Sequence, residues 1–173
     1  LFPPAETLTS GRPLANLTFA VNHAVSGLEP WSYHGVNLLV HVLAVLTLFG
    51  LVRRTLLLPR LAPRWGRDAT GLAGWVALLW GVHPLLTQSV TYLSQRTEAL
   101  MALFYLLALY GFVRGLQARP RLWHCLAVLA CLLGALCKEI IVTAPVAVLL
   151  CDLALLGERS VLANDYFQSP GAL

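Results

Sequence analysis

The sequence predicts an all-α protein, a polytopic bundle of about five transmembrane helices with an additional amphipathic helix at the membrane interface. Of the 173 residues, 58% are hydrophobic and only 12% are charged, whereas about a quarter of the residues in a soluble domain are charged. The apolar residues form continuous Leu- and Ala-rich runs, not the alternation typical of a membrane β-barrel. The net charge of +4 comes from arginines concentrated in short loops between these runs.

Residues 1–32 predict an outer-side loop that contains one amphipathic helix. Pro13 suits the first turn of a helix, where its missing N–H costs nothing. Leu14, Leu17, Val21 and Val25 then follow near one helix face. We expect this helix to lie along the membrane surface.

Three spanning segments follow along the chain. Residues 33–52 are long enough to cross about 30 Å of hydrocarbon at 1.5 Å per residue. Residues 70–92 predict the second span, with a break or kink at His83-Pro84. Residues 99–113 predict the third.

Residues 122–137 and 140–156 predict the last two spans, separated by Lys138 and Glu139. Two charges between apolar segments are costly unless they lie at the membrane surface or in a polar cavity. They therefore mark the tip of a helical hairpin or part of a site, and one long helix with a polar break is the alternative. Residues 33–156 together form the predicted helical bundle, and residues 157–173 form a polar tail that we expect to be unstructured.

The arginine distribution favours the hairpin and predicts the topology. It groups the loops at residues 53–67 and 114–121 on one side, which the positive-inside rule assigns to the cytoplasm. Residues 1–32, 83–98 and 138–143 then face the periplasm or lumen. We expect a multi-pass protein of the bacterial inner membrane, or of the endoplasmic reticulum membrane in a eukaryote.

Polar residues at the predicted outer side are candidates for phosphate binding. Arg96 carries a planar guanidinium that matches phosphate oxygens, and Lys138 offers a second cation. Glu139 would orient the phosphate or a polar substrate, and His83 would belong to the rim of a head-group pocket. Without a ligand, these residues would instead belong to solvated turns. His34 would then form hydrogen bonds between helices.

No metal, cofactor or nucleic acid is expected. His34 and His41 lie two helical turns apart, too far to bind one metal without a third element. The four cysteines lie in apolar sequence without zinc spacing. The basic clusters are not flanked by a soluble fold that could present them to nucleic acid.

Three blocks of residues in this order resemble a known family. These blocks are Arg12-Pro13-Leu14, Leu17-Thr18-Phe19-Ala20, Gly27-Leu28-Glu29-Pro30, Tyr33-His34, Asn37 and His41; then His83-Pro84, Gln88-Ser89-Val90, Tyr92-Leu93-Ser94-Gln95-Arg96 and Glu98; and last Cys137-Lys138-Glu139, Pro145 and Asp152. With these motifs the chain resembles, over roughly residues 10–156, the membrane region of the GT-C polytopic glycosyltransferases that carry tetratricopeptide repeats, which include the TMTC-type O-mannosyltransferases and their bacterial relatives.

The resemblance implies transfer of a sugar from a polyprenyl-phosphate donor on the outer side of the membrane. Arg96 and Lys138 would hold the lipid-linked phosphate, and His34, His83 and Glu139 would line the sugar or acceptor pocket. The family's acidic residues precede the Arg12-Pro13-Leu14 block, where this chain has only Glu6. We therefore expect a chain truncated at both ends that lacks those acids.

Two other functions stay open. A non-catalytic subunit of a larger membrane complex would keep these polar residues for helix packing or lipid contacts, with membrane lipids and other subunits as partners. A transporter or proton-conducting element is disfavoured because no discontinuous helix pair repeats in the two halves. The enzyme hypothesis requires an acidic side chain close to Arg96 and Lys138.

Overall fold

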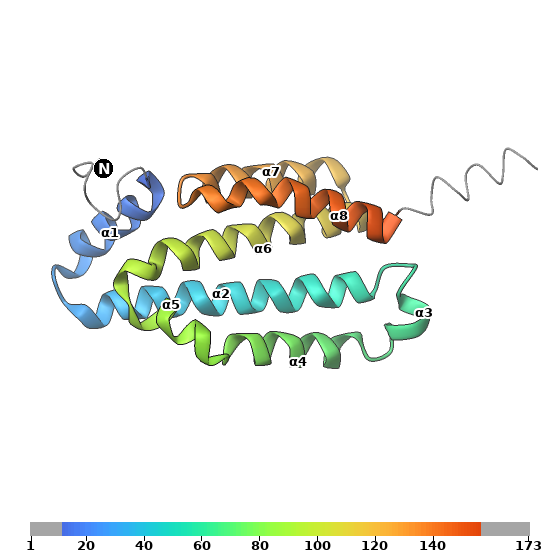
Figure 1. Ribbon diagram of the computed structural model, residues 1–173, viewed down its shortest axis with the longest axis horizontal. Coiled ribbons are helices and arrows are strands. Elements are labelled where there is room, and N and C mark those ends of the chain that lie inside the picture. Colours follow the sequence, from blue (N-terminus) through green and yellow to red (C-terminus); the bar gives the residue numbers. More distant parts are fainter. Residues whose placement is uncertain (1–11, 157–173) are drawn as a thin grey trace, which may run out of the picture.

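The chain folds into a bundle of helices, shown in Figure 1 as a computed structural model that describes residues 12–156. No strand occurs in that range, so the predicted all-α class is confirmed. The elements in chain order are α1 (Pro13–Ser26), α2 (Pro30–Leu56), α3 (Ala62–Trp65), α4 (Ala69–Gly81), the 3-10 helix η1 (Pro84–Leu86), α5 (Thr87–Thr91), η2 (Leu93–Gln95), α6 (Arg96–Gln117), α7 (Pro120–Ala135), η3 (Glu139–Thr143) and α8 (Ala144–Leu156). The predicted tail at 157–173 and the first 11 residues, Glu6 included, lie outside the described residues.

Two segments are long and apolar enough to cross a membrane. Pro30–Leu56 has 27 residues and Leu93–Gln117 has 25, and both contain a strongly apolar window. They correspond to the predicted first and third spans. The helices α4, α7 and α8 have 13, 16 and 13 residues, so by length they do not establish the five predicted spans.

The predicted second span is interrupted at His83-Pro84. His83 has an extended backbone (φ −63°, ψ 132°), and α4 ends just before it at Gly81. Proline lacks a backbone N–H, and its ring disfavours helical geometry in the preceding residue, so the helix cannot continue. The chain crosses the remaining stretch to Arg96 through η1, α5 and η2, which places several polar side chains at one end of the bundle.

The last two segments form a hairpin instead of one long helix. Lys138 is extended (φ −162°, ψ 147°), and α7 and α8 run in opposite directions on either side of η3 (Figure 1). The backbone N–H groups of Cys137 and Lys138 both donate to the carbonyl of Gly134. The amide of Leu14 donates to the Leu136 carbonyl at 3.3 Å, which ties the start of α1 to this turn.

Helix α6 is central, since it packs against both α2 and α7, while α4 packs on another side of α2. The contacts use small residues. A Cβ on Gly111 of α6 would lie 3.1 Å from the Ala127 Cβ of α7, so these two helices approach closely. The buried core accordingly contains many alanines, whereas large apolar side chains lie outside, among them Leu39, Leu46, Trp75, Leu79, Leu132 and Leu150.

The two ends of the bundle differ in chemistry. One end carries α1, α5, the start of α6 and the turn before η3, and the opposite end carries α3 and the α6–α7 connection (Figure 1). The loops that the charge pattern groups together thus lie at the same end. Which end faces the cytoplasm stays a prediction.

Candidate functional site

Arg96, the first residue of α6, is buried at the end of the bundle that carries α1. Its side chain is fully buried, and Nε donates to Asn37 Oδ1 at 2.7 Å. Nη2 donates to Asn22 Oδ1 at 3.1 Å and to the Tyr33 carbonyl at 2.9 Å. One guanidinium therefore connects α6 to α1 and α2.

Aromatic rings complete the surroundings of this guanidinium. Its central carbon lies 4.3 Å from the Phe19 ring centroid and 5.5 Å from that of Tyr33, distances at which cation–π attraction operates. Nη1 is buried without a hydrogen-bond partner among the described residues. Arg96 thus lies inside the protein, and the contacts that the structure gives it are to helices, not to the surface of a pocket.

Glu98 and Lys138 form an ion pair at the same end. Glu98 lies in the first turn of α6, and Lys138 precedes η3, so the pair connects α6 to the α7–α8 hairpin. The two side chains are 36% and 19% exposed, respectively. The extended backbone at Lys138 brings its ammonium to the carboxylate of a residue 40 positions earlier.

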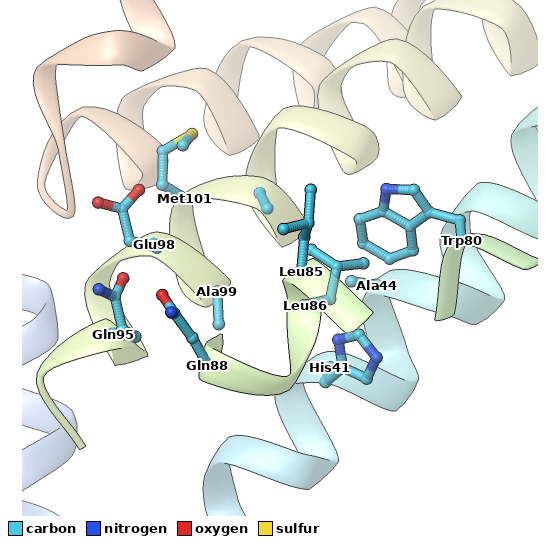
Figure 2. Close-up of a pocket in the computed structure, with 11 residues that line it drawn as sticks. His41, Ala44, Trp80, Leu85, Leu86, Gln88, Gln95, Glu98, Ala99 and Met101 are labelled. Carbon is cyan, nitrogen blue, oxygen red and sulfur yellow. The ribbon is translucent and has the colours of Figure 1, made fainter. Parts of the chain in front are cut away.

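A pocket of about 300 Å³ opens beside Glu98, between α2, α4, η1, α5 and α6. Figure 2 shows Gln88, Gln95 and Glu98 on one side and Trp80 with Leu85 on the other. The pocket therefore offers two amides and one carboxylate opposite an indole ring. The Pro84 break creates it, because the chain leaves the helical path there and lines the cavity with η1 and α5.

His41 and Trp80 line the wall of this pocket where α2 meets α4. Their rings stack with centroids 5.7 Å apart, and His41 Nε2 lies 2.9 Å from the Gly81 carbonyl. The carbonyl can only accept, so this nitrogen carries the proton. The contact satisfies the carbonyl of Gly81, the last residue of α4, and fixes the imidazole at the pocket wall.

The structure brings together only some of the predicted site residues. Lys138 joins the pocket through Glu98, whereas Arg96 is not among the pocket-lining residues. Glu139 and His34 are exposed on η3 and α2. His83 is exposed and accepts the Leu85 amide through Nδ1 at 3.3 Å, so it caps η1. The binding roles of these residues stay predictions.

Sequence reasoning missed the pairing of Glu98 with Lys138 and the positions of His41 and Trp80 in the pocket wall. No local pattern signals a contact across 40 residues. The signal that existed was the expectation of an acid near Arg96 and Lys138, and the structure places Glu98 beside Lys138.

Side chains that can bind hydroxyl groups line this pocket, and the ammonium of Lys138 lies beside it through the ion pair with Glu98. An ammonium attracts phosphate, and amides and a carboxylate bond to hydroxyls. An indole face packs against the apolar side of a sugar ring. No cluster of three or more metal-binding side chains occurs in the described part of the chain.

Comparison with known proteins identifies several relatives that are protein O-mannosyl-transferases of the TMTC type. The chain is 37% identical over 122 residues to the protein O-mannosyl-transferase TMTC2 of Mus musculus, and this alignment covers 66% of the chain and 13% of the relative. It is 36% identical over 143 residues to Tmtc1 of Drosophila melanogaster, with 83% of the chain and 15% of the relative aligned. It is 34% identical over 170 residues to TMTC4 of Homo sapiens, with 88% of the chain and 22% of the relative aligned.

The chain thus spans between about a tenth and a quarter of the length of these relatives. No protein-family model matches it, and no solved structure matches it.

Proposed function

Because the chain is homologous to one segment of the TMTC-type protein O-mannosyl-transferases, we propose that it forms part of the membrane region of such an enzyme. The pocket beside Glu98 would receive the sugar of a polyprenyl-phosphate mannose donor. The observation that carries the proposal is the Glu98–Lys138 ion pair at the edge of this pocket.

The proposed roles follow from charge and position. Lys138 attracts the donor phosphate, and Glu98 fixes the ammonium and accepts hydrogen bonds from sugar hydroxyls. Gln88 and Gln95 bond to further hydroxyls, and Trp80 packs against the ring. Arg96 acts as a positioning residue, since it holds α1 and α2 against the start of α6 that carries Glu98.

The membrane setting supports a lipid-linked donor. Large apolar side chains surround the bundle, and small ones fill its helix contacts, a distribution expected of helices that face lipid. A polyprenyl chain would remain in the bilayer while its phosphate reaches Lys138. Since the relatives are animal proteins, we propose the endoplasmic reticulum membrane, with this pocket on the luminal side.

Glu98→Gln and Lys138→Gln, each introduced into the whole protein, test this function. We expect each variant to transfer mannose to a protein acceptor with a kcat/KM lowered about 10- to 100-fold, because a charge-assisted contact contributes roughly 1.5–3 kcal/mol. Transfer of radiolabelled mannose from a polyprenyl-phosphate donor measures it.

Glu29→Gln is the matched control. Glu29 is an exposed acid at the same end, in the α1–α2 connection, and it does not line the pocket. Transfer by this variant should equal that of the unaltered protein. Full transfer by Glu98→Gln and Lys138→Gln would instead favour the non-catalytic subunit.

A further inference from the structure

A second feature of the bundle is a groove that crosses α2, α6 and α7 and runs from the middle of these helices towards the arginine-rich end. One hollow of about 410 Å³ lies between α6 and α7, where Trp123, Leu126 and Leu133 contribute to its wall. A second hollow of about 230 Å³ lies between α2 and α6. Leu107 and Tyr110 line both hollows. We call these two neighbouring hollows together the Tyr110 groove.

Arg114 lies at the arginine-rich end of the Tyr110 groove. It follows Leu107, Tyr110 and Gly111 at helical spacing, so it continues the same face of α6. Its guanidinium carbon lies 5.4 Å from the Trp123 ring centroid. Its Nε is buried without a hydrogen-bond partner among the described residues. A cationic donor therefore lies unsatisfied beside an aromatic wall of the groove.

Arg54, near the end of α2, contacts the ring of Tyr110. Its Nε donates to the Tyr110 hydroxyl at 2.9 Å, and its guanidinium carbon lies 5.5 Å from the Tyr110 ring centroid. Tyr110 and Trp123 in turn make an edge contact at 5.9 Å. Two guanidinium groups thus flank two adjoining aromatic rings.

The positive charge at this position has no carboxylate partner. Within residues 12–156, neither Arg54 nor Arg114 forms an ion pair. The exposed Arg119 and Arg121 add further positive charge at the same end. A bound anion would balance this charge, and the apolar hollows would accommodate a hydrocarbon chain.

We propose that the Tyr110 groove binds an anionic phospholipid. One acyl chain lies in the hollows along Leu107, and the phosphate contacts Arg114 and Arg54. A tyrosine and a tryptophan at this depth are typical of the boundary between hydrocarbon and head groups. A zwitterionic lipid fits less well, because its ammonium would meet the surrounding arginines. The site rests on the membrane setting proposed above, but its two arginines lie at the other end of α2 and α6 from Glu98.

Native mass spectrometry of the whole protein, equilibrated in detergent micelles with equal amounts of phosphatidylglycerol and phosphatidylcholine, tests the site. We expect the protein to retain phosphatidylglycerol preferentially. Arg114→Gln should lower this retention about tenfold, because a hydrogen bond from a charged donor to the phosphate contributes roughly 1.5 kcal/mol. Leu129→Trp should also lower it, since Leu129 lines the groove and is 50% exposed.

Arg67→Gln is the matched control, with the same loss of charge at an exposed position that does not line the groove. Equal retention of both lipids by the unaltered protein would overturn the proposal, as would an equal loss in Arg67→Gln and Arg114→Gln. Glu98→Gln should retain phosphatidylglycerol fully. Lipid retention and sugar transfer therefore fail independently of each other.

Discussion

Among single residues, Arg96 shows how a polar group can be useful inside an apolar bundle. Its guanidinium gives three hydrogen bonds to Asn22, Asn37 and the Tyr33 carbonyl and lies against two aromatic rings. A charge without such partners would be costly in this environment. With them, one side chain joins three helices at the end of the bundle that carries the pocket beside Glu98.

Arg96→Met should lower the free energy of unfolding by about 3 kcal/mol or more, because it leaves the buried Asn37 oxygen without its donor. Asn37→Leu should be destabilising as well. The double variant should lose less than the sum of the two, since the residues share one contact. Chemical denaturation in detergent measures the effect, and the exposed Arg121→Met should be nearly neutral. A loss in Arg96→Met no larger than in Arg121→Met would contradict this role.

Which residues are candidates for a site could be predicted from the sequence more easily than which residues contact one another in the fold. Lys138 is conspicuous because it lies between two apolar runs, and Glu98 is an acid that the structure places beside it. The contact between them depends on the extended backbone at Lys138 and on the packing of α7 against α6. Neither is encoded in a local pattern. The same holds for Arg96, whose type suggested a phosphate ligand although its surroundings are other helices.

Among the elements, close helix packing depends on small side chains. Ala69, Ala73 and Ala77 recur every four residues along α4 and are all buried, whereas Trp75 and Leu79 are exposed. Helix α4 therefore presents its alanine face to the bundle and its bulky face outward. Without a hydrophobic driving force between helices in lipid, such close contacts provide the van der Waals attraction that holds them together.

Ala73→Leu should lower the free energy of unfolding by about 1–3 kcal/mol, because Ala73 is fully buried and added methyl groups would separate α4 from its neighbours. Thermal unfolding in detergent measures the change. Ala24→Leu, the same substitution at an exposed position in α1, is the control and should change little. A comparable effect of the two substitutions would show that the alanine face is not a packing surface.

The elements that the sequence predicted well are those with long, uninterrupted apolar runs. The predicted spans at 33–52 and 99–113 appear as α2 and α6, and each helix extends beyond the predicted span at both ends. The break at His83-Pro84 was predictable because proline cannot continue a helix. The short helices η1 and α5 were not, since their geometry depends on the cavity that they close against α2 and α6.

At the scale of the whole molecule, an ion pair at one end of the bundle and arginines that form no ion pair within residues 12–156 at the other end are separated by most of the length of α6. Ion-paired Glu98 and Lys138 lie at one end beside a pocket with amides. Arg54 and Arg114 lie at the other beside an apolar groove. Such a difference between the two ends would suit a protein with two lipid contacts. It would take a sugar from a lipid on one side of the membrane and bind anionic lipid on the other.

The most direct test of the sugar pocket is a photocrosslinking measurement on the whole protein. A photoreactive amino acid at Gln95, inside the pocket, should be labelled by radioactive polyprenyl-phosphate mannose, and excess unlabelled donor should abolish the labelling. The same group at Trp75, which is 65% exposed on the outer face of α4, should give only background. Lys138→Gln should reduce the signal at Gln95. Equal labelling at both positions, unaffected by Lys138→Gln, would contradict a donor site at this end of the bundle.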